Sequence, residues 1–129
     1  MDERENSLIL SATKVGAAVF NVVGVYDDSW CAPHVSFGVG ANSDLTVCEL
    51  TVWLRSSEER TTSLFSVRFN DREPFEFDVP HEHLVCVQAA CPCAPGDTTR
   101  AAIQCANLVR TTIGDVRPLS FMLLNVRFS

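Results

Sequence analysis

The sequence predicts an all-β protein, an antiparallel β-sandwich of seven to eight short strands. Apolar and polar residues alternate along most of the chain, and a period of two is typical of a strand with one buried face. Turn-forming glycine, proline, aspartate and serine residues interrupt this alternation at short intervals. Very little of the chain shows the period of a helix. Together these three observations favour strands joined by short turns.

The size of the chain indicates a single domain. It has 129 residues, of which 47% are hydrophobic and 20% are charged, the balance of a folded globular protein. A domain of this length buries about two-thirds of the surface of its unfolded chain, which is enough for a stable core. We expect a flexible N-terminus over residues 1–12 and one sandwich domain over residues 13–129.

The amino-terminal half contains three predicted strands, Ala17–Tyr26, His34–Val39 and Leu45–Leu54. The first is apolar at nearly every position, which predicts burial on both faces. The second is short because a proline precedes it and glycines interrupt its end. The faces of the third carry Cys48, Leu50, Val52 and Leu54 on one side and Leu45, Val47 and Trp53 on the other. We expect Trp53 to lie in the core.

The middle of the chain predicts two strands joined by a turn. In Ser63–Phe69 the phenylalanines and Val67 point inward, and Ser66 and Arg68 point outward. In Phe75–Val79 the apolar residues share one face and the two carboxylates share the other, as in a half-buried antiparallel strand. We expect these carboxylates to face water.

The carboxyl-terminal part adds the strands Leu84–Ala90 and Leu119–Phe128. The segment Asp97–Val109 between them has two interpretations. It is either a helix capped by Asp97 or Thr98, or a strand with Ile103, Cys105 and Val109 inward. The β-branched residues at its end favour the strand.

Charge and composition argue against nucleic-acid and membrane partners and against a secreted protein. The formal net charge is −6 and the 10 basic residues are dispersed, so we expect no nucleic-acid partner and no anionic membrane surface. The first residues lack the features of a secretory signal, and no apolar run approaches the roughly 18 residues of a transmembrane helix. Six cysteines in this context indicate free thiols. We expect an intracellular protein, cytoplasmic or attached to a cytoskeletal or other internal structure.

One segment concentrates possible zinc ligands, namely His81, His83, Cys86, Cys91 and Cys93. A tetrahedral zinc site takes four imidazole or thiolate ligands. The usual C-x2-C spacing is absent, however, and in a strand Cys86 would point away from the histidines. Buried cysteine is also a common small hydrophobe. We therefore expect no metal, with His81, His83, Cys91 and Cys93 as the candidates if zinc binds.

Calcium would need several carboxylates converging from loops. Asp27 and Asp28 are adjacent in one loop, and Asp115 lies in a later turn. Because adjacent aspartates are common turn formers, we expect no cofactor, with these three as the candidates if calcium binds.

Trp30 is the candidate partner-binding residue. It follows a short polar loop, and an exposed loop tryptophan can anchor a protein partner. The alternative is that its ring folds back over the end of the sandwich.

The second half of the chain resembles a C2 domain. In that family a strand of the form N-P-x-W-N-E-x-F-x-F-x-V leads to an L-x-V-x-V strand and then to an I-G-x-x-x-I-P-L turn. The matching residues are Asn70, Phe75, Phe77 and Val79, then Leu84, Val85 and Val87, then Ile113, Gly114, Pro118 and Leu119. The family's calcium sites use a D-x-D after the second of these strands, and Gln88–Asp97 has no such pair. The resemblance therefore implies a calcium-independent C2-like domain, a kind that more often binds proteins than lipids.

The favoured hypothesis for function is a non-catalytic protein-interaction or scaffolding module. It would be a domain of a larger protein or a subunit of an assembly such as a cilium, centriole or capsid. The chain lacks the G-x-S-x-G, H-E-x-x-H and P-loop motifs of common enzyme classes. One alternative is a calcium- or lipid-dependent membrane-targeting C2 domain, and a second is a zinc-binding or cysteine-based enzyme. The sequence leaves the oligomeric state open.

Overall fold

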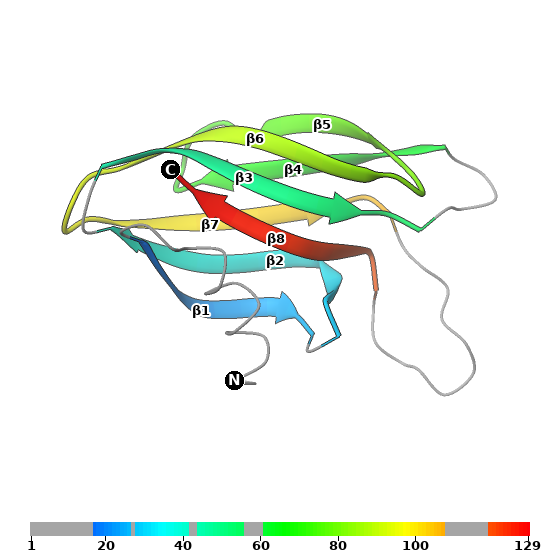
Figure 1. Ribbon diagram of the computed structural model, residues 1–129, viewed down its shortest axis with the longest axis horizontal. Coiled ribbons are helices and arrows are strands. Elements are labelled where there is room, and N and C mark those ends of the chain that lie inside the picture. Colours follow the sequence, from blue (N-terminus) through cyan, green and yellow to red (C-terminus); the bar gives the residue numbers. More distant parts are fainter. Residues whose placement is uncertain (1–16, 27, 42–43, 56–60, 108–118) are drawn as a thin grey trace.

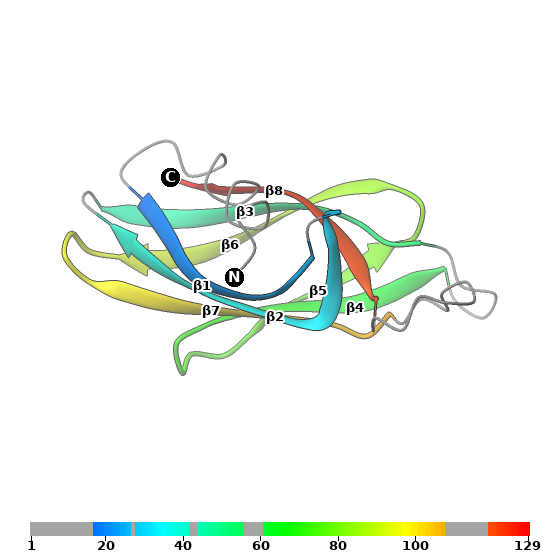
Figure 2. The same ribbon diagram turned by 90° about the horizontal axis from the view of Figure 1, so that it is seen from below.

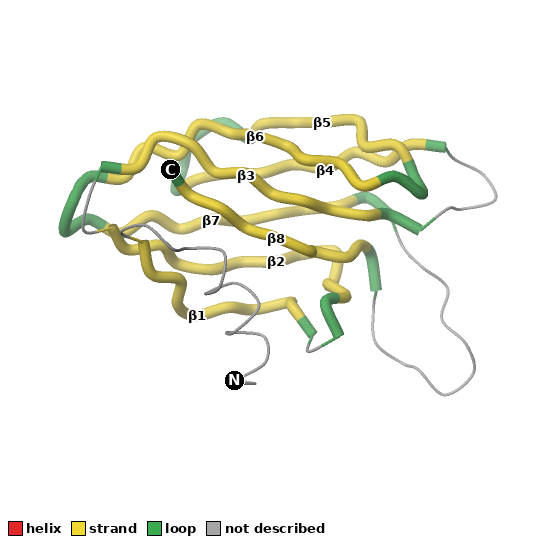
Figure 3. The backbone as a smooth tube through the Cα atoms, viewed as in Figure 1, coloured by secondary structure: helices red, strands yellow, loops and turns green. Residues whose placement is uncertain are grey.

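The computed structural model describes residues 17–26, 28–41, 44–55, 61–107 and 119–129. Within these ranges it contains eight strands and no helix (Figures 1 and 3). The strands are β1 (Ala17–Val25), β2 (Trp30–Ala41), β3 (Leu45–Trp53), β4 (Thr62–Phe69), β5 (Phe75–Pro80), β6 (Leu84–Cys93), β7 (Thr98–Cys105) and β8 (Phe121–Phe128). Their pairings are antiparallel, so the prediction of an all-β antiparallel sandwich is confirmed. The N-terminal segment predicted to be flexible lies outside the described residues.

The strands form two layers that pack face to face (Figure 2). The larger layer has the order β1-β2-β7-β4-β5, and the smaller layer has the order β8-β3-β6. Strand β2 belongs to both, because His34–Gly40 pairs with β7 whereas Trp30 and Cys31 pair with β8. Figure 2 shows the first part of β2 turning steeply out of the larger layer toward β8.

The hydrophobic core lies between the two layers. Every second residue of β4 and β7 is buried, and the inward phenylalanines of the two layers meet edge to face. The ring centroids of Phe65 and Phe121 are 5.2 Å apart, and those of Phe37 and Phe128 are 6.4 Å apart. The predicted outward positions Ser66 and Arg68 are confirmed, since both lie opposite the core face of β4.

Strand β1 differs from its prediction. Val19, Val22 and Val25 are buried, but Phe20 is 39% exposed and Val23 is 62% exposed. Within the described residues β1 pairs with β2 alone, so it forms the edge of the larger layer and only one of its faces meets the core. The expected burial on both faces was therefore wrong.

Three further expectations are corrected or confirmed. The strand expected at His34–Val39 begins earlier, at Trp30, because Pro33 lies at the bend of β2 rather than before the strand. Trp53 is half-buried and faces outward, because Val52 occupies the core side of β3. Of the two interpretations of Asp97–Val109, the strand is confirmed as β7, with Ile103 and Cys105 inward, and Val109 lies outside the described residues.

The backbone of β1 comes unusually close to β2 at Gly24. Its φ is +92°, and a Cβ atom there would lie 2.2 Å from the carbonyl oxygen of His34. The register between the two strands also shifts on either side of Val23. Both the backbone angle and the contact require glycine at this position.

Candidate binding surfaces

An apolar row crosses the outer face of the smaller layer. Trp30 is paired in register with Met122, Met122 with Trp53, and Trp53 with Leu84. Side chains of directly paired residues in an antiparallel sheet lie on the same face. This face points away from the core, since the neighbouring Val52 is fully buried on the other side. We call Trp30, Met122, Trp53 and Leu84 the apolar row.

The two tryptophans of the apolar row are in contact. Their ring centroids are 6.3 Å apart with an interplanar angle of 73°, an edge-to-face arrangement. Both rings are half-buried, and Leu84 at the end of the row is 68% exposed. Asp28 holds the start of β2, since its Oδ1 accepts a hydrogen bond from the backbone N–H of Trp30 at 3.3 Å. Trp30 thus packs along the sheet face against Trp53.

A groove of about 850 Å³ lies on the outer face of the larger layer. Its floor and sides include Phe20, Val23, Ser36, Gly38, Arg68 and Arg100. Strand register explains why these residues share one face. Phe20 is paired with Gly38 and Gly38 with Arg100, while Val23 is paired with Ser36.

One side of the groove is apolar and is formed by β1. The ring of Phe20 lies over Gly38, where a Cβ atom would come within 2.4 Å of the ring atom Cε2. Any larger residue at position 38 would displace the ring. The glycine therefore lets Phe20 lie low against the floor of the groove.

The other side of the groove is cationic. The Nε of Arg68 donates a hydrogen bond to the backbone oxygen of Arg72 at 3.0 Å, which orients its side chain. The backbone N–H of Arg100 donates to Oδ1 of Asn70 at 2.9 Å, which fixes β7 beside the turn after β4. Asp71 also lines the groove. Among the described residues, however, neither arginine has a carboxylate within ion-pair distance.

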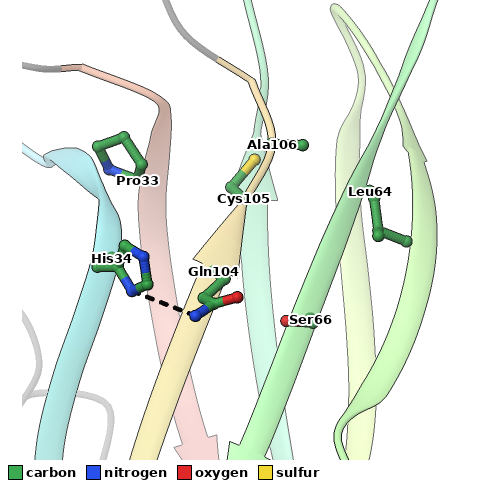
Figure 4. Close-up of a pocket in the computed structure, with 7 residues that line it drawn as sticks. All are labelled: Pro33, His34, Leu64, Ser66, Gln104, Cys105 and Ala106. Carbon is green, nitrogen blue, oxygen red and sulfur yellow. Dashed lines mark hydrogen bonds between the residues drawn. The ribbon is translucent and has the colours of Figure 1, made fainter.

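A smaller hollow of about 170 Å³ adjoins this groove (Figure 4). His34 and Gln104 lie side by side in it, with Nδ1 and Nε2 3.4 Å apart, and Ser66 is next in register on β4. Cys105 also lines the hollow. Burial raises the pKa of its thiol, so this sulfur is a neutral thiol and a weak nucleophile at neutral pH.

Ser63 and His81 form a buried pair that the sequence analysis did not identify. The Oγ of Ser63 lies 2.7 Å from Nε2 of His81, and both residues are less than 10% exposed. Nδ1 of His81 has no hydrogen-bond partner among the described residues. A serine beside a histidine is the start of a hydrolytic site, but this pair is closed off from solvent.

The four candidate zinc ligands are distributed over both ends of β6. His81 and His83 lie in the turn before the strand, whereas Cys91 and Cys93 lie at its far end, roughly 30 Å away by strand rise. Burial, with a contribution from nearby Cys93, raises the pKa of Cys91 to about 11, which opposes the thiolate that zinc requires. In the described part of the chain, no group of three or more metal-ligating side chains is brought together.

Two of the three candidate calcium ligands lie outside the described residues. Asp27 and Asp115 lie outside the described residues, and Asp28 is exposed in the turn before β2. Of the residues that carry the C2 resemblance, Phe75, Phe77 and Val79 lie on β5, and Leu84, Val85 and Val87 lie on β6. Asn70 lies in the turn after β4, Leu119 lies just before β8, and Ile113, Gly114 and Pro118 lie outside the described residues. Within the described ranges, no helix is long and apolar enough to cross a membrane.

Comparisons with known proteins give a likeness in fold. No known family profile matches the sequence. No curated protein matches it either. Among solved structures, a variant exo-β-1,3-galactanase from Phanerochaete chrysosporium with β-1,3-galactotriose has a TM-score of 0.53 and 13% identity, over 89% of this chain and 26% of the galactanase chain.

A second structure of that galactanase, with galactose, has a TM-score of 0.47 and 9% identity, over 94% of this chain and 28% of the other. The chain therefore spans about a quarter of the length of these neighbours. At such low identity the likeness with the higher TM-score concerns the fold alone.

Proposed function

We propose that this domain is a non-catalytic protein-binding module that docks a partner through the apolar row. The observation that carries the proposal is the register of Trp30, Met122, Trp53 and Leu84 across one outward face. Aromatic side chains clustered at a partly exposed surface are the typical anchors of protein interfaces. The partner would present apolar side chains to this face.

Binding at the apolar row would remove apolar surface from water. Large apolar side chains that stay in contact with solvent gain roughly 25 cal/mol for each Å² buried by a partner. Leu84 is 68% exposed, so much of its surface is still available for burial. Tryptophan adds the possibility of a hydrogen bond from its indole N–H at the rim of the interface.

The state of the thiols supports a reducing compartment for this module. The six cysteines, all of which lie in the described ranges, form no disulfide with one another, and Cys86 is exposed whereas the other five are buried. An oxidising compartment favours disulfides in small domains. We therefore propose an intracellular site of action.

A substitution at Leu84 tests the proposed interface. Leu84→Asp places a charge in the apolar row at a side chain that is already largely exposed, so the fold is retained. The matched control is Leu64→Asp, because Leu64 is 44% exposed on the outer face of the larger layer.

We expect a protein captured by the wild type from an extract of its own organism to be retained by the control and lost by Leu84→Asp. The purified partner should then bind Leu84→Asp at least tenfold more weakly, as for a hot-spot residue. Equal capture by all three forms would refute the apolar row as the interface.

A further inference from the structure

We propose that the groove on the larger layer is a second binding site, for an extended peptide segment in which acidic and apolar residues alternate. The site lies on the opposite face of the molecule from the apolar row and does not depend on it. The inference therefore goes beyond the proposed function.

The floor of the groove is formed by small residues, which leaves space for a bound peptide. Ser36 and Gly38 of β2 and Ala102 of β7 are small, and they lie side by side across the two central strands. The residues of β7 that line the groove run from Thr98 to Ala102. At about 3.4 Å per residue this length accommodates several residues of an extended chain.

The two sides of the groove differ in chemistry. Phe20 and Val23 of β1 form an apolar side and are 39% and 62% exposed. Arg68 and Arg100 form the facing cationic side. Because alternate side chains of an extended peptide point in opposite directions, a peptide of alternating character can satisfy both sides at once.

The placement of the two arginines matches the spacing of such a peptide. Arg68 is paired with Ala102, and Arg100 stands two residues before Ala102 on the neighbouring strand. The two side chains are thus diagonal neighbours, about 7–8 Å apart at their Cα atoms. Carboxylates two residues apart on an extended chain are about 7 Å apart, so each can face one guanidinium.

Charge complementarity also favours an acidic ligand. The chain carries a net charge of −6, yet this groove gathers two guanidinium groups on one side. Like charges at diagonal positions repel each other, and Asp71 is not within ion-pair distance of either group among the described residues. A bound carboxylate would relieve this repulsion and accept charge-assisted hydrogen bonds.

The experiment uses a fluorescein-labelled peptide of alternating aspartate and phenylalanine, with asparagine in place of aspartate in the control peptide. Binding to the whole chain is followed by fluorescence anisotropy at about 50 mM salt, where charge screening is weak. The variants are Arg68→Gln with Arg100→Gln, and Phe20→Ala. The matched control is Arg127→Gln, an arginine exposed on the smaller layer.

We expect the double arginine variant to bind the acidic peptide at least tenfold more weakly, and Phe20→Ala to bind it several-fold more weakly. The control Arg127→Gln and Leu84→Asp should bind as the wild type does, and circular dichroism should show that all variants are folded. Equal affinity for the asparagine peptide, unchanged binding by the double variant, or an equal loss in Arg127→Gln would overturn the proposal. None of these outcomes would affect the proposal that the apolar row binds a partner, because that proposal is tested with Leu84→Asp.

Discussion

The hydrogen bond between Ser63 and His81 connects the start of β4 to the turn after β5. A neutral imidazole has one donor and one acceptor, and the serine hydroxyl satisfies Nε2. The backbone N–H of His81 donates to the carbonyl oxygen of Thr61 at 2.9 Å, which strengthens the same connection. The pair therefore acts on stability by fastening the turn.

Removing the hydroxyl should be costly because it leaves a second ring nitrogen buried without a partner. We expect Ser63→Ala to lower the free energy of unfolding by about 1–3 kcal/mol in urea titrations. The double variant Ser63→Ala with His81→Leu should recover most of the lost free energy of unfolding, because neither side chain then leaves a buried polar atom unsatisfied. Unchanged stability of the single variant would show that the hydrogen bond contributes nothing.

At the scale of elements, the approach of β1 to β2 depends on one glycine. Gly24 has a positive φ, and the carbonyl of His34 occupies the space of a side chain. Gly96 also has a positive φ, of +83°, but nothing lies within 4 Å of a Cβ atom placed there. A substitution at Gly96 therefore measures the cost of the backbone angle alone. A substitution at Gly24 measures that cost together with the cost of the contact with the His34 carbonyl.

Alanine at these two positions should therefore have unequal effects. We expect Gly96→Ala to cost about 1–2 kcal/mol from the backbone angle alone. Gly24→Ala should cost at least about 1 kcal/mol more, because β1 must also move away from β2. Thermal unfolding of both variants measures the difference. Equal costs would mean that β1 adjusts freely at its edge position.

The sequence predicts where the strands lie better than it predicts the place of each strand in the sheet. Alternation in Ser63–Phe69 identifies both the strand and its inward face, because the strand has core on one side only. Alternation cannot show which strand forms an edge, so the apolar residues of β1 suggested double burial. Pro33 suggested a strand boundary, whereas the structure uses it at a bend between two layers.

At the scale of the whole molecule, both candidate surfaces arise from pairing between distant segments. Trp30, Met122, Trp53 and Leu84 come from four different strands and share no local pattern. Of these four residues, the sequence predicted only Trp30 as a partner-binding residue, in a loop. The sheet order that makes it the first member of a row follows from long-range pairing, which no local motif specifies.

The whole molecule should also lose stability at alkaline pH because of its buried thiols. Burial raises the pKa of Cys91 from its ordinary value of 9.0 to about 11, and it raises the pKa values of Cys48 and Cys105. Above pH 9 the unfolded chain therefore releases protons that the folded chain retains. The free energy of unfolding falls by about 1.4 kcal/mol per pH unit for each thiol ionised in the unfolded chain alone.

Urea unfolding under reducing conditions between about pH 7 and pH 10.5 checks this expectation, with a flat region below the unfolded thiol pKa and a decline above it. Cys91→Ala should reduce the slope of the decline. Cys86→Ser serves as the control variant, because Cys86 is the cysteine that is exposed in the folded chain. A stability that does not change up to pH 10.5 would contradict the prediction.

Strand β2 carries parts of both candidate surfaces. Trp30 at its start belongs to the apolar row, and Ser36 and Gly38 farther along form the floor of the groove. A partner bound at Trp30 therefore contacts the same strand that forms the floor of the groove. If occupation of either face shifts β2, the two ligands become thermodynamically linked, and each must change the affinity of the other by the same factor. Two ligands bound to the two faces would then influence each other's affinity through β2.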